Sequence, residues 1–276
     1  MWRVYSSQSL PVDRWRAVAG AHLTLAPEFL EIWRATGATP LYFLTDPAAD
    51  TPQCGFTALR FGARPFGRTQ ALVDGLPAAL AGQGAAESSA SRAFSAALDA
   101  LARASGLRAT WVDYDLLSQR FAPPPSWKQQ IVTTQVIQEP AERLRFNKRV
   151  ERHIASAKER GAFVRPIGDR TEVSACVALM RQTFKRHGRA RAYPAAFYDR
   201  LYNLARQDSR VIWLVCLIDN TIIGSHIALR IDNEILSWQP YVDRERREYK
   251  PAYLLYDALI RHAGADGADA VNLGGS

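Results

Sequence analysis

The chain has 276 residues, of which 47% are hydrophobic, so it is long and apolar enough for two domains with cores of their own. Its net charge of +8 favours an anionic partner such as nucleic acid, a phosphorylated carrier or a membrane surface. The alternative explanation is a GC-rich genome, which makes a chain rich in arginine and alanine. The three cysteines lack metal or disulfide spacing, the N-terminus has no apolar core of signal-peptide length, and the longest apolar run is far shorter than the ~20 residues of a membrane span. We therefore predict a cytoplasmic protein without a metal site or transmembrane segment.

The first half is predicted to form an α/β unit of its own. Apolar residues at three-to-four spacing indicate an amphipathic helix over Ser89–Ser105, and the β-branched run Gln129–Val136 indicates a strand. The remaining elements, in chain order, are predicted at Trp2–Tyr5, Val12–Ala21, Pro27–Thr36, Pro40–Leu44, Gly55–Phe61, Thr69–Val73 and Thr110–Val112.

A single long helix is predicted over Glu139–Gly161, because Pro140 suits its first turn and Gly161 its C-terminal cap. Leu144, Asn147, Val150, Ile154 and Ala157 share one face, and the other faces are strongly basic. That basic surface is either a footprint for an anionic chain or an ordinary solvated face. We place the domain boundary before this helix, which gives domains at 1–138 and 139–276.

The last quarter of the chain carries the strongest pattern. Two-residue turns at Asp219–Asn220 and Asp232–Asn233 suit β-hairpins. The predicted elements after the long helix are the strand Ala162–Ile167, a helix capped by Asp169 or Thr171 that runs to about Arg186, the helix Pro194–Gln207, the strands Val211–Ile218, Thr221–Ile231 and Glu234–Val242, the helix Pro251–Gly267 and the strand Ala270–Ser276. An antiparallel meander followed by a helix and a further strand places a loop, a helix N-terminus and a strand end around one cleft.

These segments resemble the Fem-type and related acyltransferases of the GNAT superfamily. The resemblance rests on RHIASAKERGAFVRP (Arg152–Pro166), LMRQTFKRHG (Leu179–Gly188), the helix at Tyr249–Gly267 and VNLGGS (Val271–Ser276). It implies an α/β (α+β) fold of tandem GNAT-like domains, each a mixed, mainly antiparallel sheet flanked by helices. The first domain would be a degenerate copy of the second, which agrees with the similar order of elements in the two halves. Similar proteins continue beyond Ser276 with closing strands, which leaves truncation of the C-terminal domain as one interpretation.

The donor-binding loop departs from the usual GNAT pattern. The segment Glu245–Tyr253 contains none of the glycines whose amides normally hold a pyrophosphate in front of a helix. Side chains would take over that role, so Arg246, Arg247, Tyr249 and Lys250 are our candidates for cofactor binding. The resemblance implies acyl-CoA or aminoacyl-tRNA as the donor substrate, with no permanently bound cofactor and with tRNA as a candidate partner.

Acyl transfer to an amine needs aligned substrates, a hydrogen-bond donor for the developing oxyanion and a route for the amine proton. Tyr241, at the end of a central strand, is the first candidate for this donor, and His226 is the second candidate as a base. Gln239 should share the face of Tyr241, whereas Trp238 should face the other way. Each of these residues also has an ordinary structural explanation in a strand.

The acceptor site is predicted from two further segments and from Gln239 in the strand of Tyr241. Their candidate residues are Arg181, His187, Arg189, Gln239, Asn272, Gly274 and Gly275. The acceptor would be a small-molecule or lipid-linked amine, such as a cell-envelope or polysaccharide precursor. The leading interpretation is therefore a GNAT N-acyltransferase. A non-catalytic nucleic-acid-binding or scaffolding protein with the same fold is the alternative.

Overall fold

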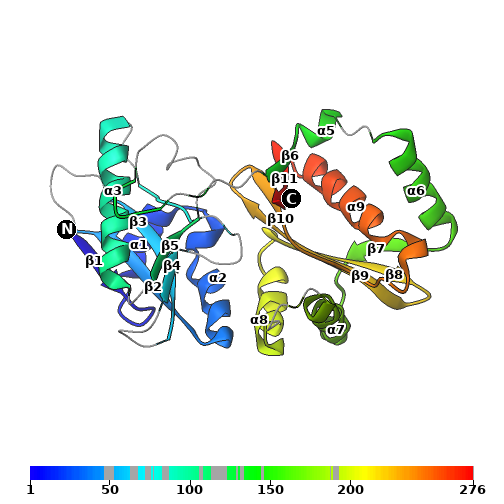
Figure 1. Cartoon of the computed structure of the whole chain (residues 1–276), viewed down its shortest axis with the longest axis horizontal. Coiled ribbons are helices and arrows are strands. Elements are labelled where there is room, and N and C mark those ends of the chain that lie inside the picture. Colours follow the sequence, from blue (N-terminus) through cyan, green and yellow to red (C-terminus); the bar gives the residue numbers. More distant parts are fainter. Residues whose placement is uncertain are drawn as a thin grey trace. The chain divides into compact units, whose positions relative to one another are not determined.

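The computed structural model describes residues 1–46, 53–62, 68–71, 76, 78–82, 87–105, 108–112, 123–128, 130, 134–143, 146–186, 188 and 193–275. The chain divides into two compact units, residues 1–131 and 132–276, and each unit is built on one β-sheet (Figure 1). No helix in the described part of the chain combines the length and the apolarity that crossing a bilayer requires.

The first unit contains a five-stranded sheet in the order β1-β2-β3-β4-β5. Neighbouring strands are antiparallel except β4 and β5, which are parallel and joined through α3. The elements predicted from Trp2–Tyr5 to Thr110–Val112 are present with their ends shifted by a few residues, although residues 72–73 of the strand predicted at Thr69–Val73 lie outside the described residues. Their bounds are β1 Trp2–Tyr5, α1 Val12–Ala19, η1 Leu23–Leu25, α2 Pro27–Ile32, η2 Trp33–Thr36, β2 Ala38–Thr45, β3 Gly55–Phe61, β4 Arg68–Ala71, α3 Glu87–Ala104 and β5 Arg108–Trp111.

Helices cover both faces of this first sheet. Strand alternation sends Leu41 and Phe43 of β2 into the cluster that contains Phe94 of α3. Tyr42, between them, faces the other way, and its ring lies 5.3 Å from that of Trp15 in α1. The strand is therefore apolar on both faces, which is why β2 reads as a continuous apolar run rather than an alternating one.

The second unit contains a six-stranded sheet in the order β6-β11-β10-β9-β8-β7. The predicted meander is confirmed with the predicted bounds, and Asp219 and Asn220 form its first turn with φ of 47° and 60°. The elements are β6 Thr134–Gln138, α5 Pro140–Arg143, α6 Lys148–Glu159, β7 Phe163–Pro166, α7 Arg170–Arg186, α8 Ala195–Ala205, β8 Val211–Ile218, β9 Thr221–Ile231, β10 Glu234–Val242, η3 Arg247–Tyr249, α9 Pro251–Ala265 and β11 Ala270–Gly275.

The two units repeat one topology. The order β1-α1-α2-β2-β3-β4-α3-β5 of the first unit recurs in the second as β7-α7-α8-β8-β9-β10-α9-β11. The strand directions agree as well, because the last two strands of each repeat, β4 with β5 and β10 with β11, are the parallel pair. The tandem arrangement predicted from the sequence is therefore present, and β6, α5 and α6 are additions in front of the second copy.

The single helix predicted over Glu139–Gly161 is wrong, because the structure has α5 and α6 in its place. Asn147, assigned to a helix face, instead begins α6. Its side-chain oxygen accepts hydrogen bonds from the backbone N–H groups of Arg149 at 3.1 Å and Val150 at 3.0 Å. An asparagine that satisfies these donors stabilises a helix start, and the helical period alone did not reveal it.

The strand predicted at Gln129–Val136 lies further along, at Thr134–Gln138, and residues 129 and 131–133 are outside the described residues. This strand, β6, pairs antiparallel with β11, so by its hydrogen bonds it belongs to the second sheet. The sequence had placed it in the first domain because it precedes the basic helix. The domain bounds 1–138 and 139–276 remain a prediction.

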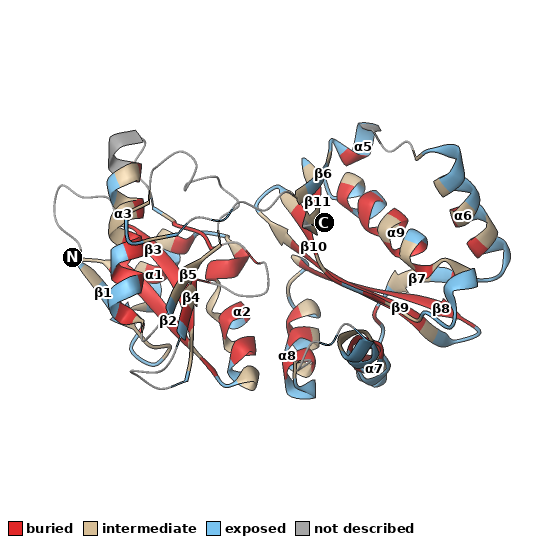
Figure 2. Cartoon of the chain, in the orientation of Figure 1, coloured by how far each residue is buried: buried red, intermediate tan, exposed pale blue. Residues whose placement is uncertain are grey.

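In the second unit, α7 and α8 cover one face of the sheet, and α5, α6 and α9 lie on the other (Figure 1). Every residue of β8 is buried, and the burial continues along the central strands (Figure 2). The α9 face is closely packed at Gly224 of β9, where an added Cβ would stand 2.9 Å from Cδ1 of Leu255 and 3.3 Å from Cβ of Pro251. The N-terminal turns of α9 therefore rest directly on the middle of the sheet.

Candidate functional site

The parallel strands β10 and β11 separate part-way along their length and form a fork. They pair only from Glu234 to Leu236, opposite Ala270 to Asn272, while β10 continues beside β9 to Val242. The register of β10 shifts between Ser237 and Gln239, so a β-bulge lies at the point where the strands part. Bulges are common next to active sites because they redirect side chains and end strand pairing.

The other arm of the fork turns away at two of the predicted acceptor residues. Asn272 is buried, and its Oδ1 accepts a hydrogen bond from the backbone N–H of Gly274 at 3.0 Å. Gly274 has a φ of 85°, a conformation that favours glycine. A Cβ at this position would stand 3.7 Å from the carbonyl oxygen of Ser237, so the turn passes close to the bulge. Gly275 completes β11 opposite Thr134 of β6.

The two candidate catalytic residues lie on opposite faces of the sheet. The ring of Tyr241 is 5.9 Å from that of Phe184 in α7, whereas the ring of His226 is 4.9 Å from that of Tyr256 in α9. The cause is the strand register. His226 stands opposite Pro240 and shares its face, and Tyr241, the next residue of β10, points to the other face. The structure does not bring Tyr241 and His226 together.

The bulge also changes which residues accompany Tyr241 on the α7 and α8 face. Gln239 is two residues from Tyr241 without a register shift between them, so it lies on that face, and it is 2% exposed. Trp238 was expected on the opposite face, but its ring is 6.2 Å from Phe197 of α8. The expectation for Trp238 is wrong because the extra residue of the bulge interrupts the simple alternation.

His226 occupies a closed environment. Its side chain is fully buried, and its Nε2 lies 2.9 Å from Oγ of Ser237, itself 6% exposed. The other ring nitrogen, Nδ1, has no hydrogen-bond partner in the described part of the chain. Burial lowers the pKa of His226 to about 4, so the ring is uncharged at neutral pH and is a weak base. Sequence reasoning missed Ser237, because only the register of β9 and β10 brings it to His226.

The predicted donor-binding residues surround the N-terminus of α9. Lys250 precedes the helix in a left-handed conformation, with a φ of 49°, and Pro251 is its first residue. Lys250, the N-cap residue, makes no side-chain capping hydrogen bond among the described residues, and Arg246 and Arg247 are exposed beside this helix end. An uncapped N-terminus carries backbone N–H groups and a partial positive charge that favour anions.

Helix α6 extends this positive region, which the sequence did not reveal. Arg160 donates from Nη1 to the carbonyl oxygen of Glu248 at 3.3 Å, and the ring of His153 lies 4.9 Å from that of Tyr253 in α9. Loss of solvent lowers the pKa of His153, and the neighbouring positive charges lower it further. We name this region the basic surface; it consists of Arg149, Arg152, Arg160, Arg246, Arg247 and Lys250.

The remaining predicted acceptor residues are less closely connected to the fork. Arg181 is exposed on α7, the helix that also provides Phe184 beside Tyr241. His187 and Arg189 lie outside the described residues. Within the described ranges, no group of three or more histidine, cysteine, aspartate or glutamate side chains is arranged to hold a metal ion.

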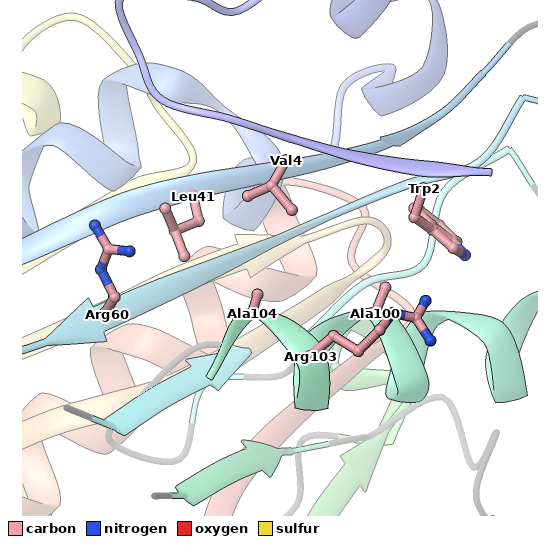
Figure 3. Close-up of a pocket in the computed structure, with 7 residues that line it drawn as sticks. All are labelled: Trp2, Val4, Leu41, Arg60, Ala100, Arg103 and Ala104. Atoms are coloured by element: carbon pink, nitrogen blue, oxygen red, sulfur yellow. The ribbon is translucent and has the colours of Figure 1, made fainter. Parts of the chain in front are cut away.

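A separate cavity lies in the first unit, between α3 and strands β1 to β3 (Figure 3). Its volume is about 370 Å³, and it contains none of the predicted site residues. Figure 3 shows Arg60 at one end and Trp2 at the other, with Leu41 and Val4 between them and Arg103 on α3. The full lining is Trp2, Val4, Leu41, Arg60, Ala100, Arg103 and Ala104.

Comparisons with known proteins agree with this geometry. Residues 145–276 match the sequence model of the family described as acetyltransferase (GNAT) domain. The structure of FemX has a TM-score of 0.64 at 11% identity, covering 99% of this chain and 89% of that chain. The C-terminal domain of a putative lysylphosphatidylglycerol synthetase from Agrobacterium fabrum has a TM-score of 0.60 at 10% identity, covering 96% and 77%. The structure of L-PGS from Bacillus licheniformis has a TM-score of 0.54 at 13% identity, covering 89% of this chain and 71% of that chain. No curated protein sequence matches this chain.

The meander, the fork and the family match define the C-terminal half as a GNAT domain. FemX covers nearly the whole chain, and the first unit repeats the topology of the second. The protein therefore has a tandem, Fem-like GNAT fold.

Proposed function

We propose that the protein is an N-acyltransferase that moves an acyl or aminoacyl group from an activated donor to an amine acceptor. The observation that carries this proposal is the fork between β10 and β11 next to a positively charged, uncapped N-terminus of α9. A fork admits the acyl group, and the positive charge suits the phosphates that such donors carry. Both parts lie in the half that matches the GNAT family model.

The donor is held, in this proposal, by side chains rather than by a glycine-rich turn. The positive charges of Arg246, Arg247 and Lys250 suit charge-assisted hydrogen bonds to phosphate. Acyl-CoA and aminoacyl-tRNA both satisfy this chemistry, and the extension of the basic surface along α6 suits a ligand with several phosphates. A structural neighbour named for lysylphosphatidylglycerol synthesis supports the inclusion of aminoacyl donors and lipid-linked acceptors in a substrate screen.

The reaction needs no covalent intermediate on the protein. The acceptor nitrogen forms a bond to the acyl carbon, the bond from that carbon to sulfur or oxygen breaks, and the amine proton passes to the leaving atom. In the proposed arrangement Tyr241 donates a hydrogen bond to the acyl oxygen or protonates the leaving atom. Gln239, Asn272 and Gly274 border the same opening, and Arg181 lies on the helix next to it.

Direct chemistry tests the proposal. The purified protein is incubated with acetyl-CoA, longer acyl-CoAs and charged tRNAs, each with a panel of amino sugars, amino acids and lipid-linked precursors. Thiol release or deacylation that depends on the amine, with an amide product seen by mass spectrometry, is the expected result. Mass spectrometry of ligands that co-purify with the protein narrows the panel. The proposal fails if no donor is bound and no amine-dependent product forms across the panel.

A second candidate function is a non-catalytic GNAT-fold protein that binds nucleic acid or acts as a scaffold. The specific observation in its favour is the basic surface combined with the absence of glycine from the loop before α9. Binding of uncharged RNA that resists competition by CoA, together with no acyl transfer, would favour this function over the enzyme.

The basic loop gives a first quantitative prediction. The variant Lys250→Ala should weaken donor binding roughly tenfold, because a charge-assisted hydrogen bond contributes ~1.5–3 kcal/mol. Arg247→Ala combined with Lys250→Ala should weaken it further without unfolding the protein. Isothermal titration with CoA and, separately, with tRNA measures the effect.

The matched control for this prediction is Arg206→Ala, which removes an exposed arginine at the end of α8, on the other face of the sheet. Its donor affinity should equal that of the parent protein. Equal affinity in the Arg247 and Lys250 double variant would instead show that the loop does not hold the donor.

A further inference from the structure

Ser237 and His226 form a buried polar pair that the proposed mechanism has not used. Ser237 is the residue of β10 at which pairing with β11 has ended and the bulge begins. Its Oγ lies 2.9 Å from Nε2 of His226, and this is its only hydrogen bond among the described residues. The pair therefore stands at the fork, with one hydrogen-bonding direction of the hydroxyl unused.

The pair lies on the α9 face, which is also the face of the proposed donor site. The ring of Tyr256 in α9 packs against His226 at 4.9 Å with an interplanar angle of 71°. Two residues before His226 on β9, a Cβ added at Gly224 would stand 3.3 Å from Cβ of Pro251 at the start of α9. A donor whose phosphates rest at the α9 N-terminus and whose acyl group enters the fork would bring its leaving atom past Ser237.

The proton on His226 decides what the serine can do. An uncharged imidazole has one N–H group, and either nitrogen can carry it. If Nδ1 carried the proton, a buried N–H group would have no acceptor, and such groups are rarer in proteins than buried acceptors lacking a donor. With the proton on Nε2, His226 donates to Oγ of Ser237, and the serine hydroxyl proton is available for another acceptor.

We propose, on the basis of the proposed function, that the Ser237 hydroxyl donates a hydrogen bond to the leaving atom of the acyl donor and that His226 is a positioning residue that directs it. The leaving atom is the thiol sulfur of an acyl-CoA or the ribose oxygen of an aminoacyl ester. As the amine forms its bond to the acyl carbon, the electron pair of the breaking bond moves to this atom. The amine proton completes it, and Ser237 and His226 end the reaction unchanged.

Nitrogen NMR of the imidazole tests the arrangement without any substrate. The chain has 5 histidines, and the His226→Gln variant assigns the resonances of His226. At pH 7 the proton should lie on Nε2, and Ser237→Ala should shift that resonance. The control Ser225→Ala removes a buried serine hydroxyl from β9, the strand of His226, on the opposite face of the sheet, and should leave the resonance unchanged. A proton found on Nδ1 would overturn the proposal, because Ser237 would then donate to His226 instead.

Kinetics with acetyl-CoA as the probe donor test the role in the reaction. Ser237→Ala should lower kcat for thiol release by about 10²-fold with little change in KM, the scale for losing one preorganised donor. His226→Gln should retain most of the activity, because its amide nitrogen reaches the position of Nε2. His226→Asn should not, because its amide corresponds to Nδ1. A kcat of Ser237→Ala within twofold of the parent overturns the inference. If the parent protein does not use acetyl-CoA, this result rejects acetyl-CoA as the donor in the proposed function and does not bear on Ser237. The NMR result then decides the proposal about Ser237 and His226.

Discussion

Replacing Tyr241 with Phe should lower the turnover of a matched donor and acceptor by about 10²-fold, the scale for losing one oxyanion donor or general acid. The ring of Tyr241 is held between β10 and Phe184 of α7, so removing only the hydroxyl should keep its position. Substrate binding should change little, because the hydrogen bond strengthens mainly in the transition state. Steady-state kinetics that separate kcat from KM measure the effect.

A matched control is available on the same face of the sheet. Tyr198→Phe removes the hydroxyl of a buried tyrosine in α8 whose ring packs on Trp213 and Phe197. This variant should keep turnover and reveal any general effect of losing a buried phenol. If Tyr241→Phe keeps full turnover while His226→Ala or His187→Ala abolishes it, the role assigned to Tyr241 is wrong although the fold is unaffected.

The strands of the C-terminal meander could be predicted because several local signals agree. Val211–Ile218 is a continuous β-branched and apolar run, and the pair Asp219–Asn220 suits a turn that needs positive φ at both positions. The helix after them begins at a proline, which fits its first position. Consistent signals at each level explain why these bounds came out correctly.

The pairing register of neighbouring strands could not be predicted in the same way. A bulge depends on the hydrogen-bonding register of two strands. The sequence around Trp238 contains no glycine, so it has no local signal that predicts the bulge. The bulge decides that Trp238 shares a face with Tyr241 and that Ser237 meets His226. The candidate residues were therefore found by type and position, while their grouping required the structure.

The basic surface shows the same limit for helices. Positive charge on α6 and positive charge in the loop before α9 are both visible in the sequence, but they are separated by 88 residues at the contact of Arg160 with Glu248. Only packing of α6 on α9 joins them. This arrangement puts the phosphate-binding candidates on the α9 face. Tyr241 of β10 instead faces α7, and Arg181 lies on that helix. A donor entering from one face and an acceptor from the other would meet at the fork.

Acidification should destabilise the protein through His226. Its folded-state pKa of about 4 lies below the ordinary value of ~6.5, so between these values the unfolded chain binds more protons than the folded one. The contribution of the uncharged His226 to the free energy of unfolding is therefore fully present above pH ~6.5. It is lost as the pH falls toward 4, at up to about 1.4 kcal/mol per pH unit. Between pH 7 and pH 5 this histidine alone should lower the free energy of unfolding by about 2 kcal/mol.

Urea unfolding at pH 7 and pH 5 measures this loss, and His226→Gln isolates it from other titrating groups. Glutamine does not titrate, so the variant should lose less stability on acidification than the parent protein, by about 2 kcal/mol. Carboxylates held at low pKa by hydrogen bonds, such as Asp169 and Glu172, are present in both proteins and cancel in the comparison. An equal loss in both proteins would mean that the pKa of His226 in the folded state is close to its ordinary value, as for a solvated side chain. That outcome would also remove the closed environment on which the pairing of His226 with Ser237 depends.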